Sequence, residues 1–112
     1  MSIEKWSETI WVVALSDEPA LSEDLLTAQE AVAQARPAPD VVVDLSAVSY
    51  VNSSNLSQLL RLRKIMIDRD RRLKLAGIAD SVWAVFLTTG LDKVFDFAND
   101  LTTALTGLQI GD

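Results

Sequence analysis

Residues 41–56 read Val-Val-Val-Asp-Leu-Ser-Ala-Val-Ser-Tyr-Val-Asn-Ser-Ser-Asn-Leu, and this stretch indicates a strand that leads into a helix. Its β-branched opening is typical of a buried strand over 41–45. Apolar residues then recur at the spacing of a helix over about 53–69; they are Leu56, Leu59, Leu60 and Ile67. The polar residues between strand and helix must therefore turn the chain.

Asn52, Ser53 and Ser54 stand where this helix is expected to begin. Each side chain can accept a hydrogen bond from an unpaired backbone N–H of the first turn, which favours a structural role. The same position also favours a modification site. A phosphoryl group there would lie at the positive end of the helix and would add about two negative charges. The residues alone leave both interpretations open.

The stretch resembles a motif of the STAS domain family, specifically of the bacterial anti-sigma factor antagonists. In that family a strand ending in Asp-Leu precedes Asp-Ser-Ser-Gly-Leu; this chain has Asp44-Leu45 and Asn52-Ser53-Ser54-Asn55-Leu56. The segment 88–95, Thr-Thr-Gly-Leu-Asp-Lys-Val-Phe, is similar to the family's Thr-Gly-Leu-x-x-x-Phe segment. The resemblance implies an α/β STAS fold as one domain over residues 1–112. It further implies a mixed, mostly parallel sheet of four to five strands with about four helices.

The resemblance also implies a function. Such proteins bind an anti-sigma factor that is also a serine kinase, a GHKL-type ATPase, and this kinase phosphorylates the second serine of the motif. By position the phosphoacceptor here is Ser54, with Ser53 as the second choice. The expected partner-binding surface consists of Ser22, Asn52, Ser53, Ser54, Asn55 and Leu56.

Three positions depart from the family pattern. Asn52 replaces an acidic residue, Asn55 replaces a glycine, and Ser22 stands where an aspartate is common. Two carboxylates that normally flank the phosphorylation site therefore look absent. Two alternatives stay open: a STAS scaffold that is never phosphorylated, or an accessory subunit of a membrane transporter of the ABC or anion type.

Composition limits the chemistry that the chain can perform. Its 112 residues include no cysteine and no histidine, which removes thiol nucleophiles, imidazole bases and nearly all common transition-metal sites. The formal charge of −6 argues against a general affinity for nucleic acid or anionic membranes. We expect no catalytic residues, no cofactor and no metal, and a monomer or weak homodimer.

The chain contains no window approaching 18 consecutive apolar residues and no start typical of a signal peptide. A cytoplasmic protein without membrane insertion is the resulting expectation. Strands are predicted over 3–8, 10–15, 41–45, 73–78 and 94–97. Helices are predicted from Ser22 to near Arg36, over 53–69, from a cap at Asp80 to Gly90, and from Asp100 onward. This alternation predicts a parallel or mixed sheet.

Seven of the ten basic residues fall within positions 61–74. They form either a solvated helix face or a docking patch for an acidic partner; nucleic acid is disfavoured because no aromatic residues are interleaved to stack bases. Arg63 lies near the middle of the apolar stripe by angle, where the simplest role is a side chain that reaches back to water. Trp6, Trp11 and Trp83 are expected to pack in the core, with Trp83 the one that could face a partner.

Overall fold

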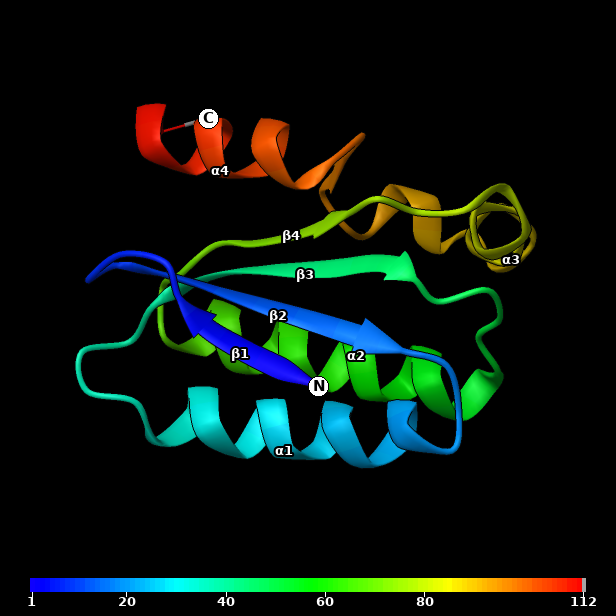
Figure 1. Ribbon diagram of the computed structural model, residues 1–112, viewed down its shortest axis with the longest axis horizontal. Helices are drawn as coiled ribbons and strands as arrows, with labels where there is room; N and C mark the ends of the chain where they lie inside the picture. The colour runs from blue at the N-terminus through cyan, green and yellow to red at the C-terminus, as the bar shows by residue number, and fades with distance from the viewer. Residues whose placement is uncertain (112) are drawn as a thin grey trace.

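The computed structural model describes residues 1–111, which form one sheet flanked by helices (Figure 1). The strands are β1 (Ser2–Lys5), β2 (Ile10–Ser16), β3 (Asp40–Ala47), β4 (Leu73–Ala76) and β5 (Phe97–Ala98). The α-helices are α1 (Ala20–Gln34), α2 (Ser53–Asp68), α3 (Asp80–Thr89) and α4 (Leu101–Ile110), and a 3-10 turn, η1 (Leu91–Lys93), follows α3. The predicted α/β class is confirmed.

The sheet is mixed and mostly parallel, as predicted. Its strand order is β1-β2-β3-β4-β5; β1 is antiparallel to β2, and the other neighbouring pairs are parallel. The carboxyl ends of β2 to β5 therefore meet at one edge of the sheet, on the right in Figure 1. We call this edge, with the loops that leave it, the carboxyl edge.

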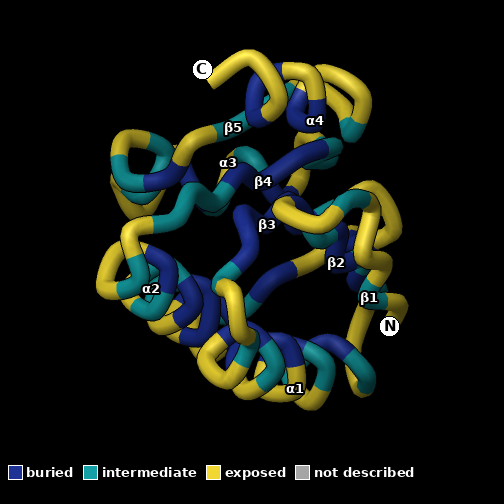
Figure 2. The backbone as a smooth tube through the Cα atoms, turned by 90° about the vertical axis from the view of Figure 1, so that its left-hand side faces the viewer, coloured by how far each residue is buried: buried dark blue, intermediate teal, exposed yellow. Residues whose placement is uncertain are grey.

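The central strand β3 has no exposed surface at Val41, Val42 or Val43 because helices cover both faces of the sheet. Val41 and Val43 belong to the larger core beneath α1 and α2, whereas Val42 packs in a smaller core beneath α4. Figure 2 shows the buried parts of the helices facing the strands. None of the helices in residues 1–111 combines the length and apolar character that a membrane span requires.

The first strand is shorter than the predicted 3–8. It ends at Lys5 because Ser7 forms a turn: its Oγ accepts hydrogen bonds from the backbone N–H of Thr9 at 3.2 Å and of Ile10 at 3.1 Å. Trp6 lies in this turn with 40% of its surface exposed, so its predicted place in the core is wrong. Trp11 and Trp83 are half-buried and pack against the larger core.

Three other predicted boundaries also change. Helix α1 begins at Ala20, two residues before Ser22, and ends at Gln34. Asp80 is the first residue of α3 and does not cap it; the capping position is Ala79, which offers no side-chain hydrogen bond. The last strand starts at Phe97 and not near 94, because the 3-10 turn after Gly90 takes up the preceding residues.

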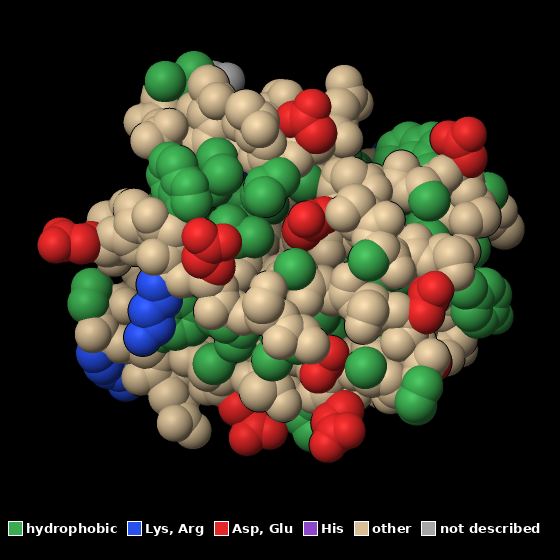
Figure 3. Space-filling model, in the orientation of Figure 1, with side chains coloured by type: hydrophobic (Ala, Val, Ile, Leu, Met, Phe, Trp, Pro, Cys, Tyr) green, Lys and Arg blue, Asp and Glu red, His purple; other side chains and the backbone are tan. Residues whose placement is uncertain are grey.

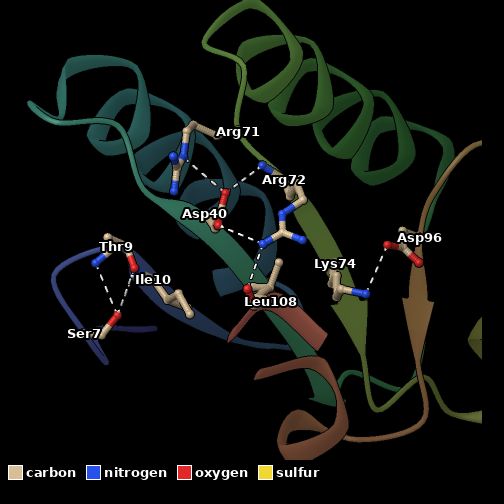
Figure 4. A network of polar contacts seen from close by, with 9 residues as sticks. All are labelled: Ser7, Thr9, Ile10, Asp40, Arg71, Arg72, Lys74, Asp96 and Leu108. Atoms are coloured by element: carbon tan, nitrogen blue, oxygen red, sulfur yellow. Dashed lines mark hydrogen bonds and ion pairs between the residues drawn. The ribbon is translucent and has the colours of Figure 1, made fainter. Parts of the chain in front are cut away.

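The basic segment 61–74 is mostly committed to contacts within the fold (Figure 4). Arg71 and Arg72 form ion pairs with Asp40 at 3.1 and 3.5 Å, and Lys74 pairs with Asp96 at 3.2 Å. Arg63 donates from Nε to the carbonyl oxygen of Val94 at 3.2 Å. Most basic side chains of this segment therefore stabilise the fold, and few of them remain for the docking patch considered from the sequence.

Candidate functional site

The serine corner, defined as Asn52, Ser53, Ser54 and Asn55, lies at the carboxyl edge where α2 begins. Asn52 Oδ1 accepts a hydrogen bond from the backbone N–H of Asn55 at 2.8 Å, and Asn55 Oδ1 accepts one from the backbone N–H of Asn52 at 3.0 Å. This reciprocal capping box satisfies donors that a helix start leaves unpaired. The capping role predicted for Asn52 is confirmed.

Ser53 and Ser54 are exposed and take no part in this cap. Within residues 1–111 neither hydroxyl forms a hydrogen bond, so the capping role considered for them is not observed. Both hydroxyls face solvent at the positive end of α2, where an anionic group would be stabilised. The structure therefore separates the two interpretations of this stretch: asparagines hold the turn, and the serines remain available.

Asn55 and Leu56 are buried, with 0% and 6% of their surfaces exposed. They belong to the predicted partner-binding set, but their side chains support the corner from beneath instead of facing a partner. Asn55 Nδ2 donates to Glu18 Oε2, in the loop before α1, at 3.2 Å and to Ser22 Oγ, in the first turn of α1, at 3.3 Å. Two positions that depart from the family pattern, Ser22 and Asn55, thus contact each other.

Glu18 completes this contact and supplies a carboxylate to the corner. It accepts hydrogen bonds from the Ser22 hydroxyl and from the Ser22 backbone N–H, the latter at 2.8 Å. These bonds, followed by that from Asn55, lower the pKa of Glu18 below its usual value, which keeps the group ionised. The family's carboxylates are absent at positions 22 and 52, but Glu18 brings a carboxylate from a different position to lie beside Ser22 and Asn55.

Asp17 brings a second carboxylate from the same loop. It accepts hydrogen bonds from Ser49 Oγ at 2.6 Å and from the backbone N–H of Ser49 at 2.8 Å. The Ser49 contacts lower the pKa of Asp17. The sequence analysis named neither acid as a site residue, although both closely follow the buried strand predicted at 10–15, which was a signal that they would lie at the carboxyl edge.

Ser49 also joins α3 to the corner. Its carbonyl oxygen accepts a hydrogen bond from Ser81 Oγ at 2.8 Å, so the loops after β2 and β3 and the first turn of α3 are linked in one place. The neighbouring Tyr50 is 64% exposed, and exposed tyrosines of this kind often anchor protein contacts. The sequence analysis did not single it out.

Buried amides fix α1 against α2 behind the corner. Gln58 Nε2 donates to the carbonyl oxygen of Ser22 at 2.7 Å, and Gln29 Nε2 donates to the carbonyl oxygen of Gln58 at 3.2 Å. Residues 1–111 contain no group of three or more acidic, histidine or cysteine side chains placed to hold a metal ion. The site thus presents two hydroxyls and two carboxylates on a firmly held turn.

Charge is unevenly distributed around this site. On the face shown in Figure 3, the few visible Lys and Arg side chains lie at the left, whereas Asp and Glu side chains are spread over the whole face, including the right-hand side where the carboxyl edge lies. A surface of this kind favours partners with complementary positive charge.

The comparisons with known proteins agree with the geometry. A family model described as "Mlab, STAS domain" matches residues 12–103. The chain belongs to the STAS domain family. No curated protein matches it with comparable significance.

Solved structures of STAS domains show the same fold. A variant of RsbS from Moorella thermoacetica has 22% sequence identity and a TM-score of 0.79, covering 96% of this chain and 93% of that one. An anti-sigma factor antagonist from Mycobacterium paratuberculosis has 24% identity and a TM-score of 0.75, with 96% and 92% covered. The STAS domain of a SulP transporter from Vibrio cholerae has 15% identity and a TM-score of 0.76, with 92% and 85% covered. The predicted STAS fold is confirmed.

Proposed function

We propose that residues 1–112 form a single STAS domain that acts as an anti-sigma factor antagonist-like protein. It would bind an anti-sigma factor serine kinase of the GHKL-type ATPase class in a cytoplasmic partner-switching pathway, without catalysing a reaction itself. The observation that carries the proposal is the pair of exposed, unbonded hydroxyls of Ser53 and Ser54 on the first turn of α2. The anti-sigma factor antagonist among the structural neighbours supports it.

Phosphorylation of Ser54 would act through charge. The phosphoryl group would lie at the positive helix end, so the fold would tolerate it. It would bring about two negative charges to a surface that already carries Asp17 and Glu18. A partner packed against the unmodified hydroxyl would then have to desolvate this charge, at a cost of several kcal/mol, which is enough to release a partner bound with roughly micromolar affinity.

The test is affinity purification of the protein from its own cells, with mass spectrometry of the bound proteins and of the peptide carrying both serines. We expect a kinase of the stated class to co-purify and phosphate to be found on Ser54. Ser54→Glu should weaken binding about tenfold or more, whereas Gln109→Glu, which adds the same charge at an exposed position of α4 outside the predicted binding surface, should bind like the wild type. Unchanged binding of Ser54→Glu would overturn the proposal.

A second candidate is an accessory subunit of a membrane transporter. The likeness to the SulP transporter STAS domain favours it. In that case a permease or a transport ATPase should co-purify with unmodified serines. A scaffold that is never phosphorylated would behave similarly, and its partner binding should be unchanged by Asn52→Asp, which restores the family's acidic residue.

A further inference from the structure

We propose that a pocket beside α3 receives a cationic side chain, lysine or arginine, of a partner protein. The pocket has a volume of about 270 Å³ and lies between the start of α3 and the end of β5. Its lining consists of Ile78, Asp80, Trp83, Phe97, Ala98 and Asn99. None of these residues belongs to the serine corner, so the proposal stands whether or not Ser54 is phosphorylated.

Two aromatic rings form the apolar part of the pocket. Trp83 and Phe97 meet edge to face, with ring centroids 5.0 Å apart and planes at 88°. Both side chains are only half-buried: they pack against the larger core and leave surface toward the pocket. Because the face of an aromatic ring is negative, exposed aromatic surface of this kind attracts a guanidinium or ammonium group.

Asp80 supplies a full negative charge beside these rings. Its side chain is exposed and forms no hydrogen bond or ion pair within residues 1–111. The start of α3 contributes an opposing charge of only about +0.5, so the carboxylate decides the sign of the local potential. A carboxylate next to aromatic rings is a combination that suits arginine, which can pair with the acid and stack on a ring at once.

The surroundings of the pocket are acidic as well. Asp100 follows Asn99 directly and accepts a hydrogen bond from the backbone N–H of Thr103 at 2.7 Å. The carboxylate of Asp44 lies close to Gly77, which directly precedes the pocket residue Ile78. No lysine or arginine is among the lining residues. The pocket therefore has no internal cation to occupy it.

The position of the pocket favours a protein partner. Ser81, next to Asp80, donates its hydroxyl hydrogen bond to the carbonyl oxygen of Ser49, whose loop leads into the serine corner. A protein that covers the corner and the exposed Tyr50 can therefore extend a long side chain over α3 into the pocket. Contacts of this charge-complementary type contribute to specificity and to the rate of association.

The test uses the full chain and a pair of probes that differ only in charge. N-acetyl-arginine amide and its neutral isostere N-acetyl-citrulline amide are titrated while NMR follows the indole N–H of Trp83 and the side-chain amide of Asn99. Trp6 and Trp11 serve as internal references. We expect the arginine probe to shift the two pocket signals and the citrulline probe to leave them nearly unchanged.

Variants locate the effect. Asp80→Asn should weaken binding of the arginine probe by about two- to fivefold, as expected for an exposed charge contact, and Trp83→Phe should weaken it while retaining apolar packing. Asp70→Asn is the matched control, because it removes one charge at an exposed position outside the pocket. Equal binding of the citrulline probe or an equal effect of Asp70→Asn would overturn the proposal, as would the absence of any shift at Trp83 and Asn99.

Discussion

Asn55 is the residue that holds the start of α2 against the start of α1. Its buried amide contacts Glu18, Ser22 and the backbone N–H of Asn52. Asn55→Ala should lower the free energy of unfolding by about 1–3 kcal/mol, because it leaves buried polar groups unpaired. Urea denaturation measures this loss, and the exposed Ser53→Ala should stay within about 0.5 kcal/mol of the wild type. A comparable loss for both variants would contradict this role of Asn55.

Glu18 should make stability depend on pH. Its pKa is lowered from 4.5, mainly by the Ser22 hydroxyl, so its contribution to stability is fully present above pH 4.5. As pH falls through the lowered pKa of the folded state, protonation removes that contribution. The difference in unfolding free energy between wild type and Glu18→Gln should therefore be constant near neutrality and shrink below pH 4.5. A difference that stays constant down to pH 3 would show that Glu18 does not titrate in this way.

For single residues, the sequence predicts contacts between near neighbours in the chain, such as helix caps. The cap at Asn52 follows from residues within one helical turn, and so does the cap at Asp100, whose carboxylate binds the backbone N–H of Thr103. The carboxylates of the serine corner could not be predicted, because Asp17 meets Ser49 and Glu18 meets Asn55 across more than 30 residues. Such contacts exist only once β2 and β3 lie side by side.

Helix α1 depends on a residue of another element for its carboxyl end. Arg69, which follows α2, donates from Nη1 to the carbonyl oxygens of Val32 at 2.6 Å and of Ala33 at 3.1 Å. A cation at this end also opposes the negative pole of the helix.

Arg69→Ala should therefore lower the free energy of unfolding by about 1–2 kcal/mol, measured by urea denaturation. Arg61, exposed and without a partner in residues 1–111, provides the control: Arg61→Ala should change stability by less than about 0.5 kcal/mol. Similar losses for the two variants would mean that general positive charge, and not the contact with α1, is responsible.

The order and type of the elements could be predicted from the sequence, but several of their ends could not. Hydrophobic periodicity predicts both ends of α2 to within one residue, since its apolar stripe extends over most of the helix. The start of α1 depends on Glu18, which satisfies the backbone N–H of Ser22 from outside the helix. The last strand is limited by its pairing with β4 and by the 3-10 turn before it. Tertiary contacts, not local preference, set these boundaries.

A network of hydrogen bonds and ion pairs around Asp40 connects several elements at the edge of the sheet opposite the serine corner (Figure 4). The side chain of Asp40 is 9% exposed, accepts a hydrogen bond from the backbone N–H of Arg72 at 2.9 Å, and pairs with the side chains of Arg71 and Arg72. Arg72 Nη2 also donates to the carbonyl oxygen of Leu108 at 2.7 Å. One carboxylate thus links β3, the start of β4 and helix α4, which covers the smaller core.

Asp40→Ala should destabilise the protein by about 2–3 kcal/mol. Breaking a fully buried ion pair costs about 3–5 kcal/mol, and the partial exposure of Arg71 and Arg72 reduces this value. Because Arg72 would lose the acid that orients it toward Leu108, hydrogen exchange should accelerate most in α4 at matched global stability. Asp70→Asn is the control, since Asn tolerates the positive φ of 56° at that position. Hydrogen exchange that accelerates uniformly over the whole sheet, with no excess in α4, would show that Asp40 stabilises the strands but does not hold α4 in place.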